Sequence, residues 1–159
     1  QMTGSITPEK SIPELKKFME QGGTVVTIGS STQLAYHLKL PVSNAIMEID
    51  NGVEKALSRE KYFIPGSILK VAVNNKRMSA AGLKEDTDVY FDNSPVFRLN
   101  PDAVSNGIIR PIAWFANEKP LRSGWALGQA YLKNGVVAFE AAVGKGKLYA
   151  FGPEITMIR

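Results

Sequence analysis

The segment Gly22–Ala35 (GGTVVTIGSSTQLA) restricts the possible folds of this chain more than any other part of the sequence. At its centre, Thr24–Ile28 is a short run of β-branched and apolar side chains that starts directly after two glycines. Such a run is too short for a buried helix and is typical of a strand that is covered on both faces. We therefore expect a buried strand here, followed by a tight turn.

A helical pattern precedes this strand. Apolar residues recur at helical spacing over positions 12–19, and Ser11–Glu14 (SIPE) matches a capping box, in which the serine and glutamate side chains satisfy free amides of the first turn. Gly22 and Gly23 favour the end of this helix, because a left-handed C-cap is easiest for glycine. The sequence therefore predicts a capped helix immediately before the strand.

A second helix is expected after the strand. Ser30 or Ser31 can cap it, and Pro41 ends the pattern soon after Leu38. The order helix, strand, turn, helix is typical of proteins whose strands run parallel. We therefore predict a single α/β domain over residues 1–159, with a mostly parallel sheet.

The rest of the chain is rich in predicted strands. Alternating or clustered apolar residues between turn signals predict strands at Ser67–Val73, Val89–Phe91, Val96–Leu99 and Ile108–Phe115. Pro111 places the last of these at a sheet edge or at a bulge. The weak pattern of Pro41–Ser58 predicts a loop with some helix. Gly135–Val143 and Lys147–Gly152 flank a glycine turn and predict a C-terminal antiparallel hairpin.

Composition limits the chemistry that the chain can perform. It has no cysteine, which excludes disulfides, thiolate metal sites and a cysteine nucleophile, and its one histidine, His37, cannot build a zinc site alone. The net charge of +4 is spread along the sequence, so no nucleic-acid partner is expected. No apolar run approaches the roughly 18 residues of a membrane-spanning helix.

The turn after the first predicted strand is the first candidate site. Ser30 and Ser31 follow the C-terminal end of that strand, where open α/β sheets bind ligands. A nucleophile elbow needs the pattern Gly-x-Ser-x-Gly and a histidine partner, and Thr32 stands near the place of the closing glycine. Helix capping accounts for both hydroxyls, so we expect Ser30 and Ser31 to shape the turn or contact a ligand, and no catalytic residue.

Two further segments are candidate binding sites. Asp92 and Asn93 follow a predicted strand and could bind a ligand or a metal through their oxygens, although an Asx-type turn is the usual role of such residues. Trp125 could form a sugar-stacking or peptide-docking surface with Trp114 and Tyr131. The alternative for these aromatic residues is ordinary packing in the core or between domains.

Six segments in order resemble the C-terminal region of large bacterial zinc carboxypeptidases of the carboxypeptidase A type, peptidase family M14: GGTVVTIGSSTQLA, EKYFIPGSILKVAV, VYFDNSPVFRL, RPIAWF, PLRSGWALGQAYL and GVVAFEAAVGKGKLYAFGPEIT. The resemblance covers about Leu15 to Thr156. It implies a class I glutamine amidotransferase-like domain, which is a flavodoxin-like three-layer sandwich. It also implies that the chain is a fragment of a longer protein in the periplasm or outside the cell.

The catalytic motifs of both families are missing. The carboxypeptidase zinc motif, His-x-x-Glu with a distant histidine, has no match, so no metal ligand is assigned and zinc is expected only in the catalytic domain of the parent protein. Amidotransferases carry a cysteine at the elbow, near Gly29 or Ser30 here, with a later histidine and glutamate. This chain has no cysteine and no histidine after His37, so a serine at the elbow would lack its general base.

These observations predict a non-catalytic accessory domain without a cofactor of its own. Its expected partner is the catalytic domain of the same polypeptide, which it would support, with self-association as a homo-oligomer or substrate binding as further roles. Two alternatives remain at this stage. One is a small-molecule or carbohydrate-binding domain that uses the crevice beside Ser30, and the other is a serine hydrolase.

Overall fold

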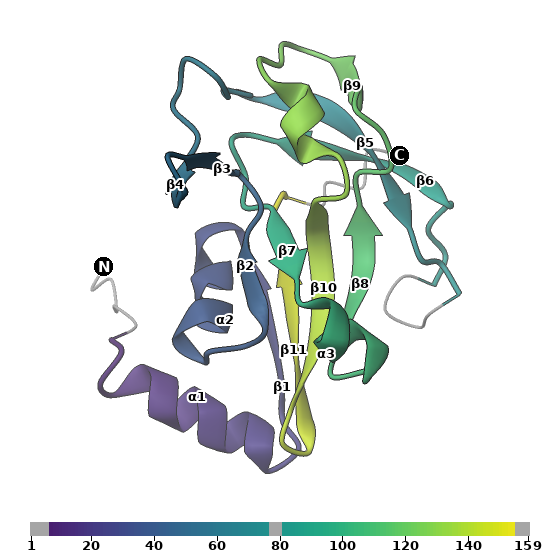
Figure 1. Cartoon of the computed structure of the whole chain (residues 1–159). Coiled ribbons are helices and arrows are strands. Elements are labelled where there is room, and N and C mark those ends of the chain that lie inside the picture. The colour runs from purple at the N-terminus through teal and green to yellow at the C-terminus, as the bar shows by residue number, and fades with distance from the viewer. Residues whose placement is uncertain (1–6, 77–80, 155–159) are drawn as a thin grey trace, which may run out of the picture.

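The N-terminal helix forms where the spacing of apolar residues predicts it. In the computed structural model, which describes residues 7–76 and 81–154, helix α1 spans Ser11–Glu20 (Figure 1). Gly22 follows with a φ of +109° and donates its backbone N–H to a carbonyl of the last helical turn. This left-handed residue ends the helix, as the sequence predicts.

Two predictions for this region are wrong. No side chain caps α1: the hydroxyl of Ser11 lies within the first turn and accepts a hydrogen bond from the backbone N–H of Thr7. Strand β1 spans Thr24–Ile28 as predicted, but it is not covered on both faces, because Val26 is 57% exposed and Ile28 is 54% exposed. The strand lies at the edge of the sheet, and the face that carries Val26 and Ile28 is exposed.

Short helical segments follow β1. The 3₁₀ helix η1 spans Gly29–Gln33 and leads directly into α2, which spans Leu34–His37. Leu34 and Ala35 are buried, so this segment is held by apolar contacts on its inner side. The predicted second helix is therefore present, but its first turn is wound more tightly than an α-helix.

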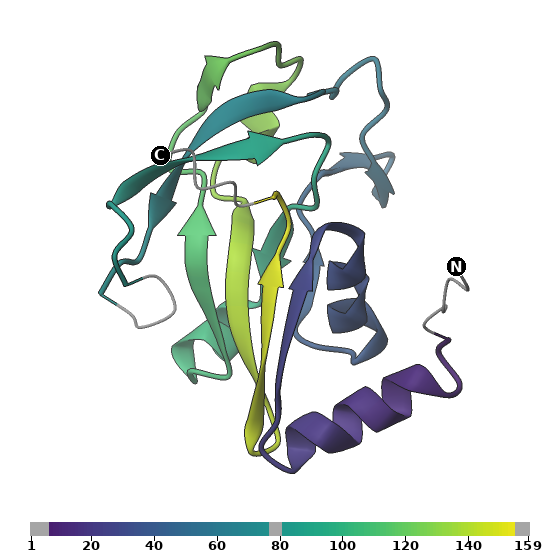
Figure 2. The same cartoon turned by 180° about the vertical axis from the view of Figure 1, so that it is seen from behind.

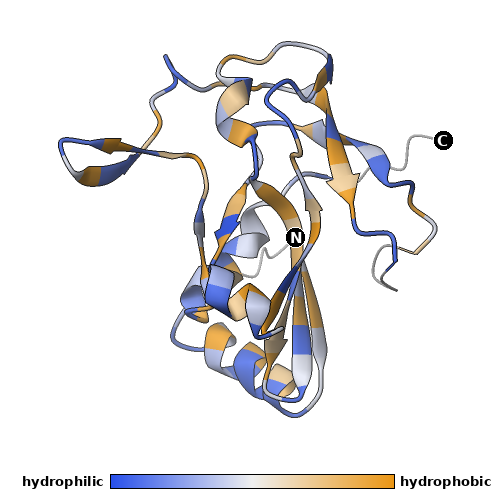
Figure 3. Ribbon diagram, turned by 45° about the vertical axis from the view of Figure 1, so that its right-hand side comes forward, coloured by the Kyte–Doolittle hydropathy of each residue, from blue (hydrophilic) through white to orange (hydrophobic). Residues whose placement is uncertain are grey.

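The prediction of a loop with some helix over Pro41–Ser58 is wrong. This segment forms three strands, which are β2 (Val42–Asn44), β3 (Met47–Asp50) and β4 (Val53–Ala56). β3 and β4 pair only with each other and project from the body of the domain (Figure 3). All four residues of β4 are exposed, so the hairpin has no buried face whose periodicity the sequence could reveal.

The remaining strands join one large sheet. Its elements are β5 (Ser67–Val73), β6 (Asp86–Phe91), β7 (Phe97–Leu99), α3 (Pro101–Ser105), β8 (Ile109–Trp114), β9 (Leu121–Ser123), η3 (Gln129–Leu132), β10 (Val136–Val143) and β11 (Gly146–Phe151). The main path runs β1-β11-β10-β8-β5-β6, with β7 also on β10, β2 on β7, and β9 on β5. The C-terminal hairpin and the burial of every second residue of β5 are confirmed.

The prediction of a mostly parallel, three-layer sandwich is wrong. Among the described residues only β1 and β11 pair in parallel, and every other pairing in the sheet is antiparallel. Parallel strands need crossover connections, usually helices, and after α2 the described part of the chain has no α-helix longer than the five residues of α3. The sheet instead curls, so that β5 and β6 arch over one end of β8 and β10 (Figures 1 and 2).

Pro111 lies at a bulge, one of the two positions that the sequence allows. β8 pairs with β10 on one side and with β5 on the other, so it is not an edge strand. The register between β8 and β10 shifts next to Phe139, which lies opposite Pro111. The irregular pairing accommodates a residue that has no backbone N–H to donate to the ladder.

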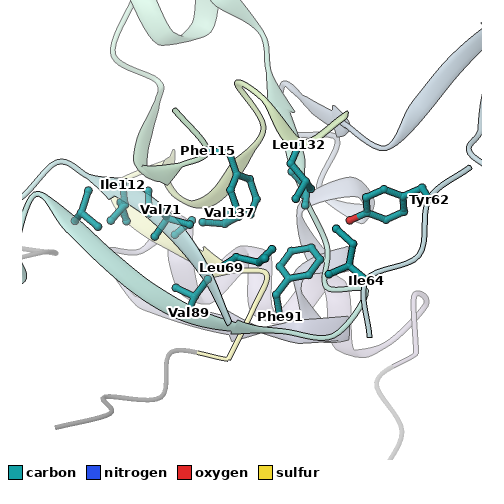
Figure 4. Packing of buried hydrophobic residues seen from close by; sticks show 14 residues of the cluster. Tyr62, Ile64, Leu69, Val71, Val89, Phe91, Ile112, Phe115, Leu132 and Val137 are labelled. Carbon is teal, nitrogen blue, oxygen red and sulfur yellow. The ribbon is translucent and has the colours of Figure 1, made fainter. Parts of the chain in front are cut away.

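Apolar residues gather in two clusters. The helix-side cluster includes Met19, Leu34, Ala35, Phe97, Ile109, Phe139, Leu148 and Ala150. The strand-side cluster includes Tyr62, Ile64, Leu69, Val71, Phe91, Phe115, Leu132 and Val137 (Figure 4). Because β10 contributes side chains to both clusters, it is the strand that is most completely buried.

Gly146 at the start of β11 provides a test of this architecture. A Cβ atom at this position would collide with the backbone carbonyl oxygens of Met19 and Gly23, neither of which is the end of a flexible side chain. We expect Gly146→Ala to lower the free energy of unfolding by about 1–3 kcal/mol, measured by urea denaturation. Lys147→Ala changes an exposed residue of the same strand and should have little effect. Equal stability of both variants would contradict the close contact between α1 and β11.

Candidate functional site

The hydroxyl of Ser31 is used by the turn that contains it. It accepts a hydrogen bond from the backbone N–H of Ile28 at 2.8 Å and donates to the carbonyl oxygen of the same residue at 2.7 Å. The hydroxyl of Thr32, which is 1% exposed, donates to the carbonyl oxygen of Gly29 at 2.6 Å. These bonds fasten the 3₁₀ turn to the end of β1.

Ser30 is exposed, and its surroundings differ from those of the Ser31 hydroxyl. Together with Ser31 and His37 it lines a mostly apolar cavity of about 340 Å³ next to α1 and β1. Among residues 7–76 and 81–154, no hydrogen bond joins either serine to His37, and no carboxylate lines this cavity. The arrangement therefore lacks the serine–histidine contact on which nucleophilic catalysis depends.

A second cavity brings together two segments that the sequence singles out. It has a volume of about 320 Å³ and lies between η1, α2 and the turn that connects β6 to β7. Thr32, Gln33 and Tyr36 come from the helical side, and Asn93 and Ser94 come from the turn. Neither Ser30 nor Ser31 lines this cavity, which is reached only by the residues that follow them.

Asn93 supports the wall of this cavity. It adopts a φ of +44°, and its Oδ1 accepts a hydrogen bond from the backbone N–H of Ile64 at 2.9 Å. Asp92 does not line the cavity, and its Oδ1 accepts from the backbone N–H of Gly66 and from Nδ2 of Asn93, both at 3.3 Å. The two side chains thus tie the β6–β7 turn to the segment before β5.

Tyr62 is one of several residues of this cavity that sequence reasoning missed. It is 8% exposed and lines the cavity from the strand-side cluster, where it lies beside Ile64 (Figure 4). Its hydroxyl is buried and has no hydrogen-bond partner among the described residues. Burial also raises the pKa of this phenol well above its ordinary value of 10.0. No periodic signal marks Tyr62, because it lies in an irregular segment between β4 and β5.

Trp125 lies outside both cavities, and hydrogen bonds to Ser67 hold its backbone N–H and carbonyl groups. Its N–H donates to the hydroxyl oxygen of the buried Ser67 at 3.0 Å, and that hydroxyl lies 2.9 Å from the carbonyl oxygen of Trp125. The indole is 54% exposed and packs edge-on against Phe63, with 6.1 Å between ring centroids. The guanidinium of Arg59 lies 4.6 Å from the centroid of the same phenyl ring, which makes a cation–π contact.

The aromatic surface that the sequence predicts around Trp125 is assembled differently. Trp114 lies in β8 and packs against the helix-side cluster. In the described part of the chain, no ring contact joins Trp125 to Trp114 or to Tyr131. The ring that contacts Trp125 is Phe63, which in turn contacts Arg59, and both lie far from Trp125 in the sequence and could not be paired with it by spacing.

The described residues contain no cluster of three or more histidine, aspartate or glutamate side chains that could hold a metal ion. No helix among them is long and apolar enough to cross a membrane. Neither observation adds a residue to the candidate sites, which remain the two cavities and the surface at Trp125.

Comparison with known proteins finds solved structures of similar fold and identifies no family. No family model matches the chain, and no curated protein matches it in sequence. The chain is similar to a solved β-galactosidase from Bacillus circulans sp. alkalophilus, with a TM-score of 0.54 and 13% identity over 91% of this chain and 18% of that one. It is also similar to Gan42B, a GH42 β-galactosidase from G. stearothermophilus, with a TM-score of 0.50 and 12% identity over 92% of this chain and 17% of that one.

The similarity to these enzymes is one of fold alone, because the identities are low. This chain spans less than a fifth of the length of each β-galactosidase. A ThuA-like protein from Bacteroides uniformis is also similar, with a TM-score of 0.49 and 11% identity over 95% of this chain and 57% of that one. The curled sheet described above is therefore an arrangement that also occurs as one segment of much longer proteins.

The two serines of the turn are expected to differ in their effect on stability. Ser31→Ala removes two hydrogen bonds to the backbone of Ile28 and should lower the free energy of unfolding by about 1 kcal/mol. Ser30→Ala is the matched control, because Ser30 is exposed and should change stability very little. Urea denaturation of the two variants measures this difference. A larger loss for Ser30→Ala would show that the turn is held in another way.

The raised pKa of Tyr62 predicts a loss of stability in alkali. Above about pH 10, an unfolded chain releases this proton while the folded chain retains it, so the unfolded state becomes more favourable as pH rises. The folded protein should therefore lose stability progressively as pH rises above about 10, and Tyr62→Phe should reduce that loss. Urea denaturation at a series of pH values provides the measurement. The same pH dependence in wild type and variant would contradict the burial of this phenol.

Proposed function

We propose that this chain is a non-catalytic accessory domain of a longer enzyme, and that this enzyme is a zinc carboxypeptidase. The absence of catalysis is proposed from the turn after β1. There the Ser31 hydroxyl is hydrogen-bonded to both the N–H and the carbonyl oxygen of Ile28. The only histidine makes no hydrogen bond to Ser30 or Ser31 among the described residues. The turn therefore has the geometry of an elbow without an activated nucleophile.

The fold comparison supports a role within a larger polypeptide. The β-galactosidases that share this fold are more than five times as long as the part of them that this chain covers. The choice of a zinc carboxypeptidase rests on the sequence resemblance of the six ordered segments. A periplasmic or extracellular location follows from the same resemblance and belongs to the same proposal.

The exposed apolar side chains of β1 are the proposed contact with the catalytic domain. Val26 and Ile28 alternate along the outermost strand and are both more than half exposed. Apolar residues that lie together at an uncovered sheet edge are typical of surfaces that meet another protein surface. We expect this strip to be buried when the domain sits beside its catalytic partner.

The genomic reading frame gives the first test, because the proposal requires a zinc-peptidase segment in the same frame. Where it is present, this chain should bind the separately produced catalytic segment in isothermal titration calorimetry. The double variant Val26→Lys, Ile28→Lys should weaken that binding at least about tenfold, since charged side chains oppose burial of the strip.

Ile108→Lys is the matched control, because Ile108 is 45% exposed and lies outside β1. It should leave binding unchanged, and thermal melting should confirm that all variants remain folded. A reading frame without a peptidase segment would rule out the carboxypeptidase part of the proposal. Covalent labelling of Ser30 or Ser31 by a fluorophosphonate probe would rule out the non-catalytic part.

A further inference from the structure

We propose that Asn51, at the tip of the β3–β4 hairpin, is a modification site at which the side-chain amide is lost spontaneously and isoaspartate forms. The sequence contains three Asn-Gly dipeptides, at residues 51–52, 106–107 and 134–135. All three carry the same reactive pair of residues, but their surroundings differ, and the structure favours reaction at the first. The proposal does not depend on the accessory function proposed above.

The reaction is an attack of a backbone nitrogen on the neighbouring side chain. The amide nitrogen of Gly52 loses its proton to hydroxide and bonds to Cγ of Asn51. The bond from Cγ to the side-chain nitrogen breaks, and that nitrogen takes a proton from water and leaves as ammonia, which restores the hydroxide. Water then opens the resulting five-membered succinimide ring at either carbonyl carbon and yields aspartate or isoaspartate. Glycine favours the attack because it has no side chain to obstruct the approach.

The attacking nitrogen of Gly52 is exposed and unbonded. β3 and β4 pair as far as Asp50 and Val53, so Asn51 and Gly52 form a two-residue loop. Their φ values of +50° and +79° match a type I′ turn, which the dipeptide Asn-Gly favours. Both residues are exposed, and the Gly52 N–H makes no hydrogen bond within residues 7–76 and 81–154. No bond has to break before this nitrogen can react.

The nitrogens of the other two glycines are held by hydrogen bonds. The N–H of Gly107 donates to the carbonyl oxygen of Val104 at 3.0 Å, at the end of α3. The N–H of Gly135 donates to the carbonyl oxygen of Leu132 at 2.8 Å, and Gly135 is itself buried. Each of these bonds must open before the nitrogen can turn toward the asparagine side chain, so both sites should react more slowly.

The hairpin that carries Asn51 also opens more easily than its surroundings. Among the described residues, β3 and β4 pair only with each other, and every residue of β4 is exposed. A two-stranded hairpin without a covering layer is marginally stable in water, and an ion pair between exposed side chains, such as that of Lys55 and Asp50, adds little. Opening at Gly135, by contrast, would disturb the buried strand β10 that follows it.

The modification would alter the hairpin itself. In isoaspartate the backbone runs through the former side chain, which adds one methylene group to the loop and removes the two-residue turn that sets Asp50 opposite Val53. Either product also places a negative charge beside Asp50. Ala56 of β4 lines the cavity of about 320 Å³, so loosening of the hairpin would reach one wall of that cavity.

The test follows the three sites in the full chain. The folded protein is incubated at mildly alkaline pH in water labelled with heavy oxygen, which marks every site that reacts before digestion. Trypsin, which does not cut before proline, then places the three dipeptides in separate peptides, 40–55, 99–122 and 134–145. Fragmentation in the mass spectrometer should locate the label at Asn51, which should react at least about tenfold faster than Asn106 or Asn134, because local opening is rarer at those sites.

The same incubation in guanidinium chloride is the control. In the unfolded chain the three asparagines should react at similar rates, because each is followed by glycine and then by a β-branched residue. A preference for Asn51 that persists in the denaturant would show that neighbouring residues in the sequence decide the rate, and would overturn the structural explanation.

Two further measurements test the product and the cause. After incubation, wild type should accept methyl groups from a protein isoaspartyl methyltransferase, and Asn51→Gln should lose most of this acceptance, since glutamine cannot form the five-membered ring. Asn106→Gln is the matched control and should behave as wild type. In amide exchange measured by NMR, the Gly52 N–H should exchange at least about tenfold faster than those of Gly107 and Gly135.

Several results would overturn the proposal. In the folded chain, equal rates at the three sites or faster reaction at Asn106 or Asn134 would contradict it. Unmodified Asn51 after a period in which the unfolded chain reacts completely would do the same, as would slow exchange of the Gly52 N–H. Unchanged methyl acceptance in Asn51→Gln would place the isoaspartate elsewhere. None of these results bears on the strip on β1 or on the carboxypeptidase reading frame, so the two proposals fail independently.

Discussion

The position of β11 between β1 and β10 is the constraint on which the rest of the structure depends. β11 pairs in parallel with β1 along Thr24–Ile28 and antiparallel with β10, so the last strand of the sheet in sequence holds the first one in place. Glycines at both ends of β11 permit this close packing. Gly146 lets β11 approach the end of α1, and Gly152 lets the carbonyl of Pro95 come into contact with the chain as it leaves the strand. A side chain at either position would collide with backbone atoms.

Placement of the cavities follows from this arrangement. Because β11 carries β1 on one side, the helical turn after β1 is fixed at one end of the sheet. Because Gly152 receives Pro95, the β6–β7 turn is fixed at the same end, with Asn93 and Ser94 facing Thr32 across the cavity. Two polar turns about sixty residues apart in the sequence thus become the opposite walls of one site. This proximity depends on the pairing of β1 with β11 and on the contact between Gly152 and Pro95, and both join segments far apart in the sequence.

Features that depend on residues close together in the sequence could be predicted, and features that depend on distant residues could not. α1, β1, β5 and the C-terminal hairpin were predictable, because apolar periodicity and glycine turns are local signals. Sheet direction was not, since the helix–strand–helix unit at Ser11–His37 occurs once and does not represent the antiparallel remainder. The β3–β4 hairpin was missed because it has no buried face. At the candidate sites, the turn chemistry of Asn93 is a local signal that the sequence shows, whereas Tyr62 gives no local signal at all.

The turn after β1 and the cavity beside it illustrate two different uses of hydroxyl groups. Ser31 and Thr32 satisfy backbone groups of their own turn, so their oxygens stabilise a shape and are not available for chemistry. The hydroxyl of Tyr62 is buried without such a bond, so the fold bears its desolvation cost. The elbow geometry of this turn therefore stabilises the end of β1 and leaves no hydroxyl of Ser31 or Thr32 free for catalysis.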